Sequence, residues 1–370
     1  MDSKTVLIVA ASGRSLAASA RRGGFAPLVV DYFGDSDTLT LAHAHACLAD
    51  GLAHGITATA LAAAVARVTA HHEPCGLVCG TGFEDRPELL THLARRWRVF
   101  GNNAETVTKL KNPIAFASLC GDLGIPHPQT TLARPADAAG WLSKRTGGAG
   151  GSHIRPAAER ETADGIYYQR EVTGSPISAQ FLSDGRAALI LGFSAQWSSP
   201  APHQPYRYGG AVRPAPLTPP MTSALTDAIH RLTATISLAG LNSADFLVEG
   251  DGFRLLEINP RPSATLDIFE PPGGSLFALH MSACDGRLGS EPPNLSGGTA
   301  TAIVYAERDI VIPALDWPEW ISDRPHADAA IKAGEPLCTV HASAATAAVA
   351  RQDADDRLAR VLRWTHARTQ

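Results

Sequence analysis

The stretch "TVLIVAASGRSLAASARRGGFAPLVVDYFGD", which begins at Thr5, is the feature that most constrains the fold of this 370-residue chain. An apolar run over residues 6–9 leads through small residues into an amphipathic segment, which ends at two glycines before a second apolar run over 27–30. A strand, a helix and a second strand in this order form a βαβ unit, which favours a parallel sheet with helices on its faces. The chain is therefore predicted to begin as an α/β protein.

Further helix and strand patterns extend this first layer to about residue 104. The segments 57–72 and 86–97 have apolar residues at helical spacing, and each is followed by a short apolar run, at 75–80 and 98–101 respectively. We therefore predict a small doubly wound α/β domain over residues 1–104.

The pattern changes after residue 104, where hairpin signals become more frequent. The expected elements are a helix that ends before Gly124, strands over 138–146 and 165–174, a hairpin over 177–197, a helix over 221–240 and a second hairpin over 242–262. Residues 198–220 are rich in proline and show neither a strand nor a helix pattern. Short strands and a helix from about residue 344 close the chain. We therefore predict a second domain over 105–295 and a β-rich segment with a helix over 296–370.

Composition excludes several classes of protein. The net charge of −4 argues against nucleic acid or an anionic membrane as the main partner. The amino-terminal apolar run is short, and no apolar stretch reaches the roughly 18 residues of a membrane span, so we expect a cytoplasmic protein. The six cysteines include no C-x-x-C pair, which favours reduced thiols over a zinc centre.

The second hairpin, "ADFLVEGDGFRLLEINPRP", carries the strongest chemical signal. Glu257, Asn259 and Arg261 alternate and therefore share one face of a strand, and the hairpin turn can bring Asp245 beside that face. Two carboxylates and an amide oxygen suit a hard divalent cation such as Mg²⁺, and an arginine beside them suits phosphate or carboxylate oxygens. A solvated strand end followed by an Asn-Pro turn is the alternative interpretation.

A glycine-rich loop, "SKRTGGAGGSHI" over 143–154, follows one of only five lysines in a chain with 27 arginines. Because arginine supplies nearly all routine positive charge, Lys144 is expected to serve where a compact ammonium is needed. The glycines can close their backbone amides over phosphates as a flap. These glycines are Gly147, Gly148, Gly150 and Gly151. An ordinary flexible hairpin tip is the alternative.

The order of these parts resembles the ATP-grasp superfamily over nearly the whole chain. The family's ordered motifs match Lys111 before "GIPHP", Lys144 before "GGAGG", then "YYQREVTG" and "LLEINPRP". The segments "VVDYFGDSDT", "GNNAETVTKLKNP", "YRYGG" and "EINPRPSATLD" look like a group described as predicted ATP-dependent carboligases related to biotin carboxylase. Some members of that group accompany tetrahydromethanopterin-linked or methylofuran-linked one-carbon pathways in methylotrophs. The resemblance implies an α/β ATP-grasp fold with a doubly wound amino-terminal domain and a small carboxy-terminal β-rich segment.

The resemblance also implies roles for individual residues. Lys111, or Lys109 because the alignment around "TKLKNP" is ambiguous by two residues, would bind ATP phosphates together with Lys144 and the glycine flap over 144–154. The hinge beside the adenine would comprise Gln169, Arg170, Glu171 and Val172, mainly through backbone groups. The metal ligands would be Asp245, Glu257 and Asn259 on the hairpin over 243–262, and the catalytic side chains would be Arg261 and Lys144.

The activity implied by the resemblance is that of an ATP-dependent carboxylate-amine ligase that forms an acyl phosphate, with ATP and Mg²⁺ or Mn²⁺ as cofactors. Its substrates would be a small carboxylate and a small amine, for example glutamate or tyramine-like substrates in tetrahydromethanopterin or methylofuran biosynthesis. By the same analogy a homodimer is expected. The residues expected to contact substrate are Tyr206, Arg207, Tyr208, Gly209, Arg213 and Ser263. The alternation of Tyr206 and Tyr208 is also typical of residues that only cover apolar surface.

Two rival functions fit the sequence less well. One is a catalytically silent ATP-grasp protein that senses nucleotide or acts as a scaffold, which the full set of lysines, acids and asparagine disfavours. The other is a dinucleotide-binding protein that uses the opening βαβ unit and Asp31 at the end of its second strand. That unit lacks the G-x-G-x-x-G pattern of such proteins.

Overall fold

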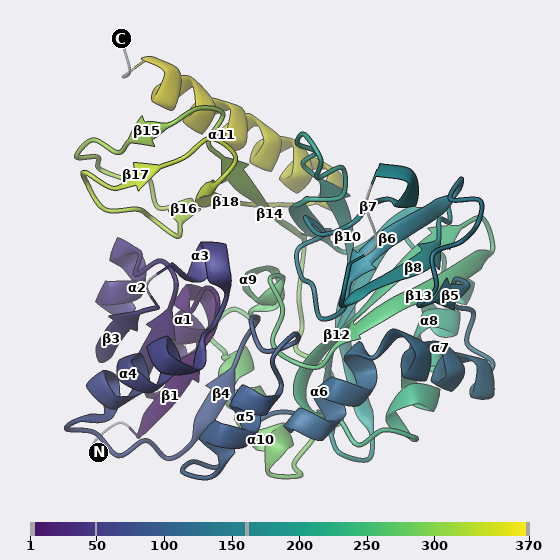
Figure 1. Cartoon of the computed structure of the whole chain (residues 1–370). Coiled ribbons are helices and arrows are strands. Elements are labelled where there is room, and N and C mark those ends of the chain that lie inside the picture. Colours follow the sequence, from purple (N-terminus) through teal and green to yellow (C-terminus); the bar gives the residue numbers. More distant parts are fainter. Residues whose placement is uncertain (1–3, 49, 160–162, 368–370) are drawn as a thin grey trace.

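A four-stranded parallel sheet forms the amino-terminal region of the computed structural model, which describes residues 4–48, 50–159 and 163–367 (Figure 1). Its strands are β1 (Thr5–Val9), β2 (Ala26–Asp31), β3 (Ala44–Cys47) and β4 (Leu77–Cys79), in the order β3-β2-β1-β4. The helices are α1 (Arg14–Arg22), α2 (Ser36–Leu41), α3 (Gly51–His54), α4 (Ala58–Thr69) and α5 (Glu88–Ala94). β2 is buried along its whole length, as strands covered on both faces are. The predicted βαβ unit is therefore confirmed.

Two details of this region differ from the prediction. The strand expected over 98–101 is reduced to a single bridge between Val99 and Leu77. β3 was not predicted, because its sequence "AHAC" mixes polar and small residues instead of forming an apolar run.

An eight-stranded sheet dominates the rest of the molecule, in the order β13-β12-β9-β10-β11-β14-β18-β16. Its strands are β9 (Ser175–Asp184), β10 (Ala188–Ser198), β11 (Tyr208–Arg213), β12 (Ala239–Glu249), β13 (Gly252–Asn259), β14 (Gly298–Tyr305), β16 (Ile321–Ser322) and β18 (Pro336–Ala344). Both predicted hairpins are present, as β9–β10 and β12–β13. Because β11 pairs with β14, this sheet runs across residue 296, where the sequence pattern predicts a boundary.

β11 corrects the prediction that residues 198–220 lack regular structure. It lies between β10 and β14, in the interior of the sheet. Its two glycines allow close approach: a Cβ on Gly210 would stand 2.3 Å from the ring of Trp197 and 2.3 Å from the carbonyl oxygen of Thr301. The absence of large side chains and the flanking prolines hid this strand from pattern analysis.

A smaller sheet in the order β5-β8-β6-β7 carries the glycine loop and lies beside β13 at the right of Figure 1. Its strands are β5 (Thr130–Thr131), β6 (Trp141–Arg145), β7 (Arg155–Pro156) and β8 (Ile166–Arg170), with α6 (Ala104–Lys111), α7 (Pro113–Asp122) and the 3-10 turn η1 (Ala157–Glu159) around it. α6 stops at Lys111 because Pro113 begins the next helix, whose first amides are capped by the Asn112 side chain.

The remaining elements cover the large sheet. They are α8 (Pro219–Thr233), α9 (Leu266–Phe269), α10 (Leu276–Cys284), α11 (Ala347–Ala367) and the small pair β15 (Ile310–Val311) and β17 (Ala330–Ile331). α8 buries Leu225 against Phe181 and Phe246, and each such side chain contributes roughly 1.5–3 kcal/mol on burial. α11 runs across β14 and β18 (Figure 1). No helix within the described residues is both long enough and apolar enough to cross a membrane.

The amino-terminal region packs directly on the rest of the chain. Ile8 on β1 and Leu16 on α1 share one apolar core with Leu241 on β12 and Phe277 on α10. This shared core fixes the first loop of the chain, at 10–14, against the large sheet.

Candidate functional site

A cleft of about 880 Å³ opens between the small sheet, the large sheet and the amino-terminal region. Most of the residues predicted to bind nucleotide, metal or substrate line it. They are Lys111, Lys144, Gly147, Gly148, Gly150, Gly151, Gln169, Arg170, Glu171, Val172, Tyr206, Tyr208, Asp245, Glu257, Asn259, Arg261 and Ser263. Lys109, Arg207, Gly209 and Arg213 do not line it. The sequence-derived set therefore converges on one cleft, with four exceptions.

The β12–β13 hairpin brings the predicted metal ligands together. Asp245 is paired directly with Glu257, and a bulge follows Asp245. The two carboxylate oxygens of Asp245 accept hydrogen bonds from the Ser178 hydroxyl at 2.6 Å and the Asn259 amide at 2.9 Å. Two carboxylates and an amide oxygen in such close proximity fit the donor set of Mg²⁺.

Lys111 neutralises part of this acidic group. Its ammonium donates to Glu257 at 2.9 Å and to the amide oxygen of Asn259 at 2.8 Å. Burial alone would raise the pKa of Glu257, but the Lys111 charge outweighs it and holds that pKa well below its usual range. Burial and the neighbouring Glu257 charge raise the pKa of Asp245.

The structure distinguishes Lys111 from Lys109, which the sequence left as alternative phosphate-binding residues. Lys111 ends α6 and is buried in the cleft, whereas Lys109 lies two residues earlier and is exposed to solvent. Residues two apart on a helix point in different directions, so only one of them can face the hairpin.

Lys144 and the predicted hinge lie at the other wall of the cleft. The Lys144 ammonium donates to Gln169 at 2.6 Å, and burial lowers the pKa of Lys144. Lys144 is on β6 and Gln169 on the adjacent β8, whose end leads into the rest of the hinge. Arg170 turns its guanidinium to the carbonyl oxygen of Ala139.

The glycine loop is closed over the cleft. A Cβ on Gly151 would stand 1.9 Å from the carbonyl oxygen of Tyr206, and one on Gly147 would stand 2.5 Å from that of Glu84. The amide of Tyr208 donates to the carbonyl oxygen of Gly150 at 2.9 Å. The loop thus contacts β11 through the backbone of Gly150, and it approaches Tyr206 and the amino-terminal region at Gly151 and Gly147, where a Cβ would clash.

Arg261 is anchored by an acid that sequence reasoning missed. Its guanidinium donates to Glu84 at 2.7 Å, and Glu84 also accepts from the amides of Gly82 at 2.7 Å and Phe83 at 3.0 Å. Burial opposes ionisation, but Arg261 and Lys111 together hold the pKa of Glu84 below its usual value. No local motif marks Glu84, because its partner lies 177 positions away.

Other side chains of the site were also missed. His127 bonds the carbonyl oxygen of Leu255 at 2.7 Å, and His153 in the glycine loop has its pKa lowered to about 4 by burial. Ser178, which holds Asp245, lies on β9 and follows no recognisable motif. Arg14, Asp267 and Asp323, from three separate parts of the chain, also line the cleft.

The residues predicted to contact substrate divide into two groups. Tyr206 bonds Glu171 at 2.7 Å, Ser263 donates to Gln180 at 2.6 Å, and Tyr208 has a buried hydroxyl without a partner among the described residues. These three residues line the cleft and form the first group.

The second group lies outside the cleft, which corrects the expectation that it faces substrate. Arg207 stacks on the ring of Tyr305 at 3.6 Å and bonds the backbone of Ser199. Gly209 packs against Trp197, and Arg213 bonds Thr299 at 2.9 Å together with nearby carbonyl groups. Their side chains or backbone hold β11 in the sheet, so the arginine charge is used inside the fold.

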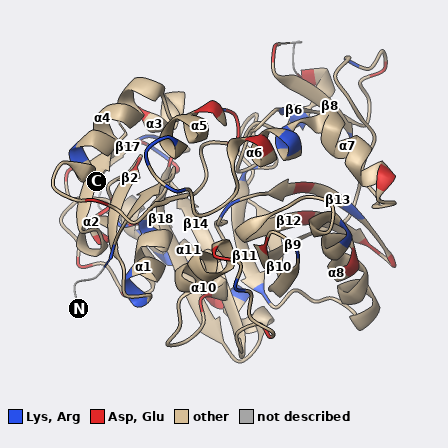
Figure 2. Cartoon of the chain, turned by 90° about the horizontal axis from the view of Figure 1, so that it is seen from below, with Lys and Arg blue, Asp and Glu red and all other residues tan. Residues whose placement is uncertain are grey.

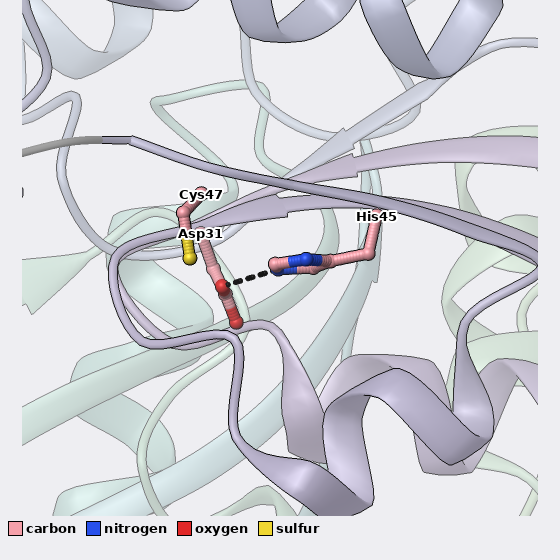
Figure 3. A group of neighbouring side chains, drawn as sticks. All are labelled: Asp31, His45 and Cys47. Carbon is pink, nitrogen blue, oxygen red and sulfur yellow. Dashed lines mark hydrogen bonds and ion pairs between the residues drawn. The ribbon is translucent and has the colours of Figure 1, made fainter. Parts of the chain in front are cut away.

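A second group of possible metal ligands, Asp31, His45 and Cys47, lies at the end of β2 and β3, outside the cleft (Figure 3). The Asp31 carboxylate already accepts from His45 at 2.9 Å, Gly13 at 3.0 Å and Gly34 at 3.0 Å. These bonds tie two loops to the sheet, which accounts for the buried acid without an ion.

Comparison with known proteins identifies a domain family over part of the chain. Residues 114–265 match the ATP-grasp domain family. The chain is 25% identical over 274 residues to the carbamoyl phosphate synthase large chain of Rubrobacter xylanophilus. The matched region covers 67% of this chain and 26% of that protein. The chain therefore contains an ATP-grasp domain, and it spans about a quarter of the length of the relatives it matches.

Solved structures agree with the fold over almost the whole chain. A biotin carboxylase complex from Campylobacter jejuni superposes with a TM-score of 0.71 at 16% identity, covering 95% of this chain and 89% of that one. The biotin carboxylase domain of Hydrogenobacter thermophilus 2-oxoglutarate carboxylase, solved as a dimer with MgADP and bicarbonate, gives 0.73 at 13% identity, with coverage of 95% and 89%. The α/β ATP-grasp fold is thus established.

Proposed function

We propose that this chain is an ATP-dependent ligase that joins a carboxylate to an amine through an acyl phosphate. The observation that carries the proposal is the convergence of Lys111, Lys144 and Arg261 with the acidic hairpin in one cleft of an ATP-grasp domain. Three cations suit the negative charge of a transferring phosphoryl group, which is stabilised by positioned charge more than by covalent chemistry.

Each residue then has a defined part in the reaction. A substrate carboxylate oxygen attacks the γ-phosphorus of ATP and ADP leaves; an amine nitrogen then attacks the acyl carbon, loses a proton and expels phosphate. Asp245, Glu257 and Asn259 would hold Mg²⁺, which supplies charge neutralisation for the phosphates. Lys111 and Arg261 would bind the oxygens that gain charge, and Lys144 would bind ATP beside the hinge. The closed glycine loop would exclude water from the acyl phosphate.

The finer proposal concerns substrate and assembly. The segments that resemble the carboligases of one-carbon pathways support a role in tetrahydromethanopterin or methylofuran biosynthesis, with glutamate or a tyramine-like amine as substrates. We also propose a homodimer, by analogy with the dimeric Hydrogenobacter domain. Both statements rest on similarity, and size-exclusion chromatography with light scattering tests the second.

The rival functions have less support. A silent nucleotide sensor has no need for the complete set of cations and acids found in the cleft. A dinucleotide site at the first βαβ unit needs a free ribose-binding acid, whereas Asp31 already accepts three hydrogen bonds and does not line the cleft.

The test combines binding and chemistry. Mg-ATP should raise the thermal midpoint of the wild-type chain, Glu257→Ala should lose that rise, and Asp251→Ala, an exposed acid in the turn of the same hairpin, should keep it. With a carboxylate panel that includes glutamate, hydroxylamine should trap an acyl hydroxamate as ADP is released. Nucleotide binding without ADP release across the acid and amine panels would favour the sensor, and the absence of any Mg-ATP effect would refute both.

A further inference from the structure

Tyr208, the first residue of β11, carries a polar group that the fold itself does not use. Its hydroxyl oxygen is buried, and no group in the described part of the chain bonds it, although Tyr208 lines the cleft. The ring packs against the apolar core that α1 and β1 share with the large sheet. A phenylalanine would give the same packing without an unpaired donor, and an unpaired buried donor is costly. The hydroxyl therefore points to a ligand of the cleft.

This hydroxyl lies near the β12–β13 hairpin that carries the predicted metal ligands, which we call the metal hairpin. Burial, and then the charge of Asp245, raise the pKa of Tyr208, so the phenol keeps its proton. Asp245 itself is not the partner of the hydroxyl, since its two oxygens accept from Ser178 at 2.6 Å and from Asn259 at 2.9 Å. A neutral donor thus stands beside the predicted Mg²⁺ ligands without adding charge to them.

The backbone of Tyr208 is fixed on both sides. Its amide donates to the carbonyl oxygen of Gly150 in the glycine loop at 2.9 Å, and its carbonyl oxygen accepts from the Tyr305 hydroxyl at 2.8 Å. β11 also lies in the interior of the large sheet, between β10 and β14. The closed loop and the sheet therefore hold Tyr208 in place together. A donor fixed in advance in this way is suited to stabilise charge that develops during a reaction.

The ligase reaction proposed above brings an acceptor to this point. A substrate carboxylate must lie next to the γ-phosphate that it attacks, and therefore next to the metal hairpin. One of its oxygens attacks the phosphorus. The other becomes the acyl oxygen of the acyl phosphate, and it gains negative charge when the amine nitrogen adds to the acyl carbon. This second oxygen needs a hydrogen-bond donor that does not also bind the phosphates.

We propose that Tyr208 is a catalytic residue whose hydroxyl donates a hydrogen bond to the acyl oxygen of the carboxylate substrate. This inference rests on the proposed ligase function and names a group that acts in it. The hydroxyl keeps its proton throughout. Its hydrogen bond strengthens as the amine nitrogen adds and the acyl oxygen gains charge. The bond weakens again when the carbonyl re-forms and phosphate leaves with the electron pair of its bond to carbon.

The experiment uses acetyl phosphate and MgADP as probes, because these require neither the natural acid nor the amine to be known. The full chain should transfer the phosphoryl group from acetyl phosphate to ADP and release acetate, which is the reverse of the first step. Tyr208→Phe should lower the kcat of ATP formation roughly tenfold or more, as loss of a charged hydrogen bond does, and leave the Michaelis constant for MgADP unchanged. Tyr32→Phe, which removes a tyrosine hydroxyl outside the cleft, should change neither value.

A second variant separates catalysis from packing. Replacement of Tyr208 by 3-fluorotyrosine keeps the ring and makes the phenol a stronger donor, so its kcat should equal or exceed that of the wild type. The proposal is wrong if Tyr208→Phe keeps the wild-type kcat, if it loses MgADP affinity as much as kcat, or if the 3-fluorotyrosine variant loses as much kcat as Tyr208→Phe. Failure of the ligase function is seen separately, because the wild type would then form no ATP from acetyl phosphate.

Discussion

Two groups of charged residues line the cleft, and they are built in different ways. The first, which we call the nucleotide end, takes its charged groups mainly from one stretch, 111–261, in which a helix end, a flap and a hairpin succeed one another. The second is the cluster of Arg14, Asp267 and Asp323, which takes one residue from each of three regions. Acidic and basic segments are interspersed along the chain (Figure 2), so the difference arises from which segments meet and not from overall charge. The predicted nucleotide-binding residues thus lie in a contiguous stretch, whereas Arg14, Asp267 and Asp323 lie where three regions of the chain join.

We expect the largest effect from substitution of Glu84, because this residue connects the nucleotide end to the amino-terminal region. Glu84→Gln should lower the free energy of unfolding by about 3 kcal/mol, since it leaves the partly buried Arg261 without its counter-charge. The rate of ADP release should fall by roughly tenfold or more, because Arg261 loses its orientation. Urea unfolding and a steady-state assay measure the two effects.

Asp355→Asn is the matched control for Glu84→Gln. It removes one partner of the Arg351–Asp355 pair, which measures 2.8 Å but is much more exposed than the Arg261–Glu84 pair, so the free energy of unfolding should change by less than about 1 kcal/mol. Equal effects of the two substitutions would mean that Glu84 does not hold Arg261 in a special position, and that the nucleotide end is independent of the first region.

Substitutions in the closed glycine loop should have a smaller effect on stability than Glu84→Gln. Ala at Gly151 must adopt φ +73° and meets the carbonyl oxygen of Tyr206, so the loop cannot close as it does here. Gly150→Ala is its control, because Gly150 has φ +70° but open space around its Cβ position. Both should cost about 1–2 kcal/mol of local strain. Only Gly151→Ala should lower kcat, by about tenfold, and release more free phosphate per product formed; equal kcat values would show that closure against Tyr206 is unimportant.

The difference between contiguous and scattered residues also explains which charged residues of the cleft could be predicted from the sequence. Asp245, Glu257 and Asn259 were predicted because the spacing of residues along a hairpin determines which side chains lie together. Lys144 was predicted because lysine is rare in this chain. Arg207 and Arg213 were placed in the cleft because the strand that follows Arg207 and ends at Arg213 was not recognised from the sequence, so its two faces could not be assigned. Arg14, Glu84 and Asp323 could not be found at all, because their roles depend on contacts over 177 to 309 positions, which no local pattern encodes.

Asp35 is a buried acid that lies close to three other acids. Burial, and then the charges of Asp323, Asp31 and Asp37, raise its pKa from 3.8 to about 8 while Arg14 opposes them, and one of its oxygens has no partner among the described residues. The folded chain therefore holds a proton that the unfolded chain releases above about pH 4, so this group makes stability fall as pH rises from about 4 to 8.

Replacing Asp35 by Asn should remove that loss. The thermal midpoint of Asp35→Asn should match wild type near pH 4 and exceed it at pH 8 by roughly 2–4 °C, measured by calorimetry across the pH range. Asp37→Asn is the control, because Asp37 accepts the amides of Asp323 and Arg324 at 2.9 Å and its loss should destabilise the chain at pH 8. A wild-type pH profile in Asp35→Asn would mean that burial and the neighbouring acids do not raise the pKa of Asp35 in the folded chain.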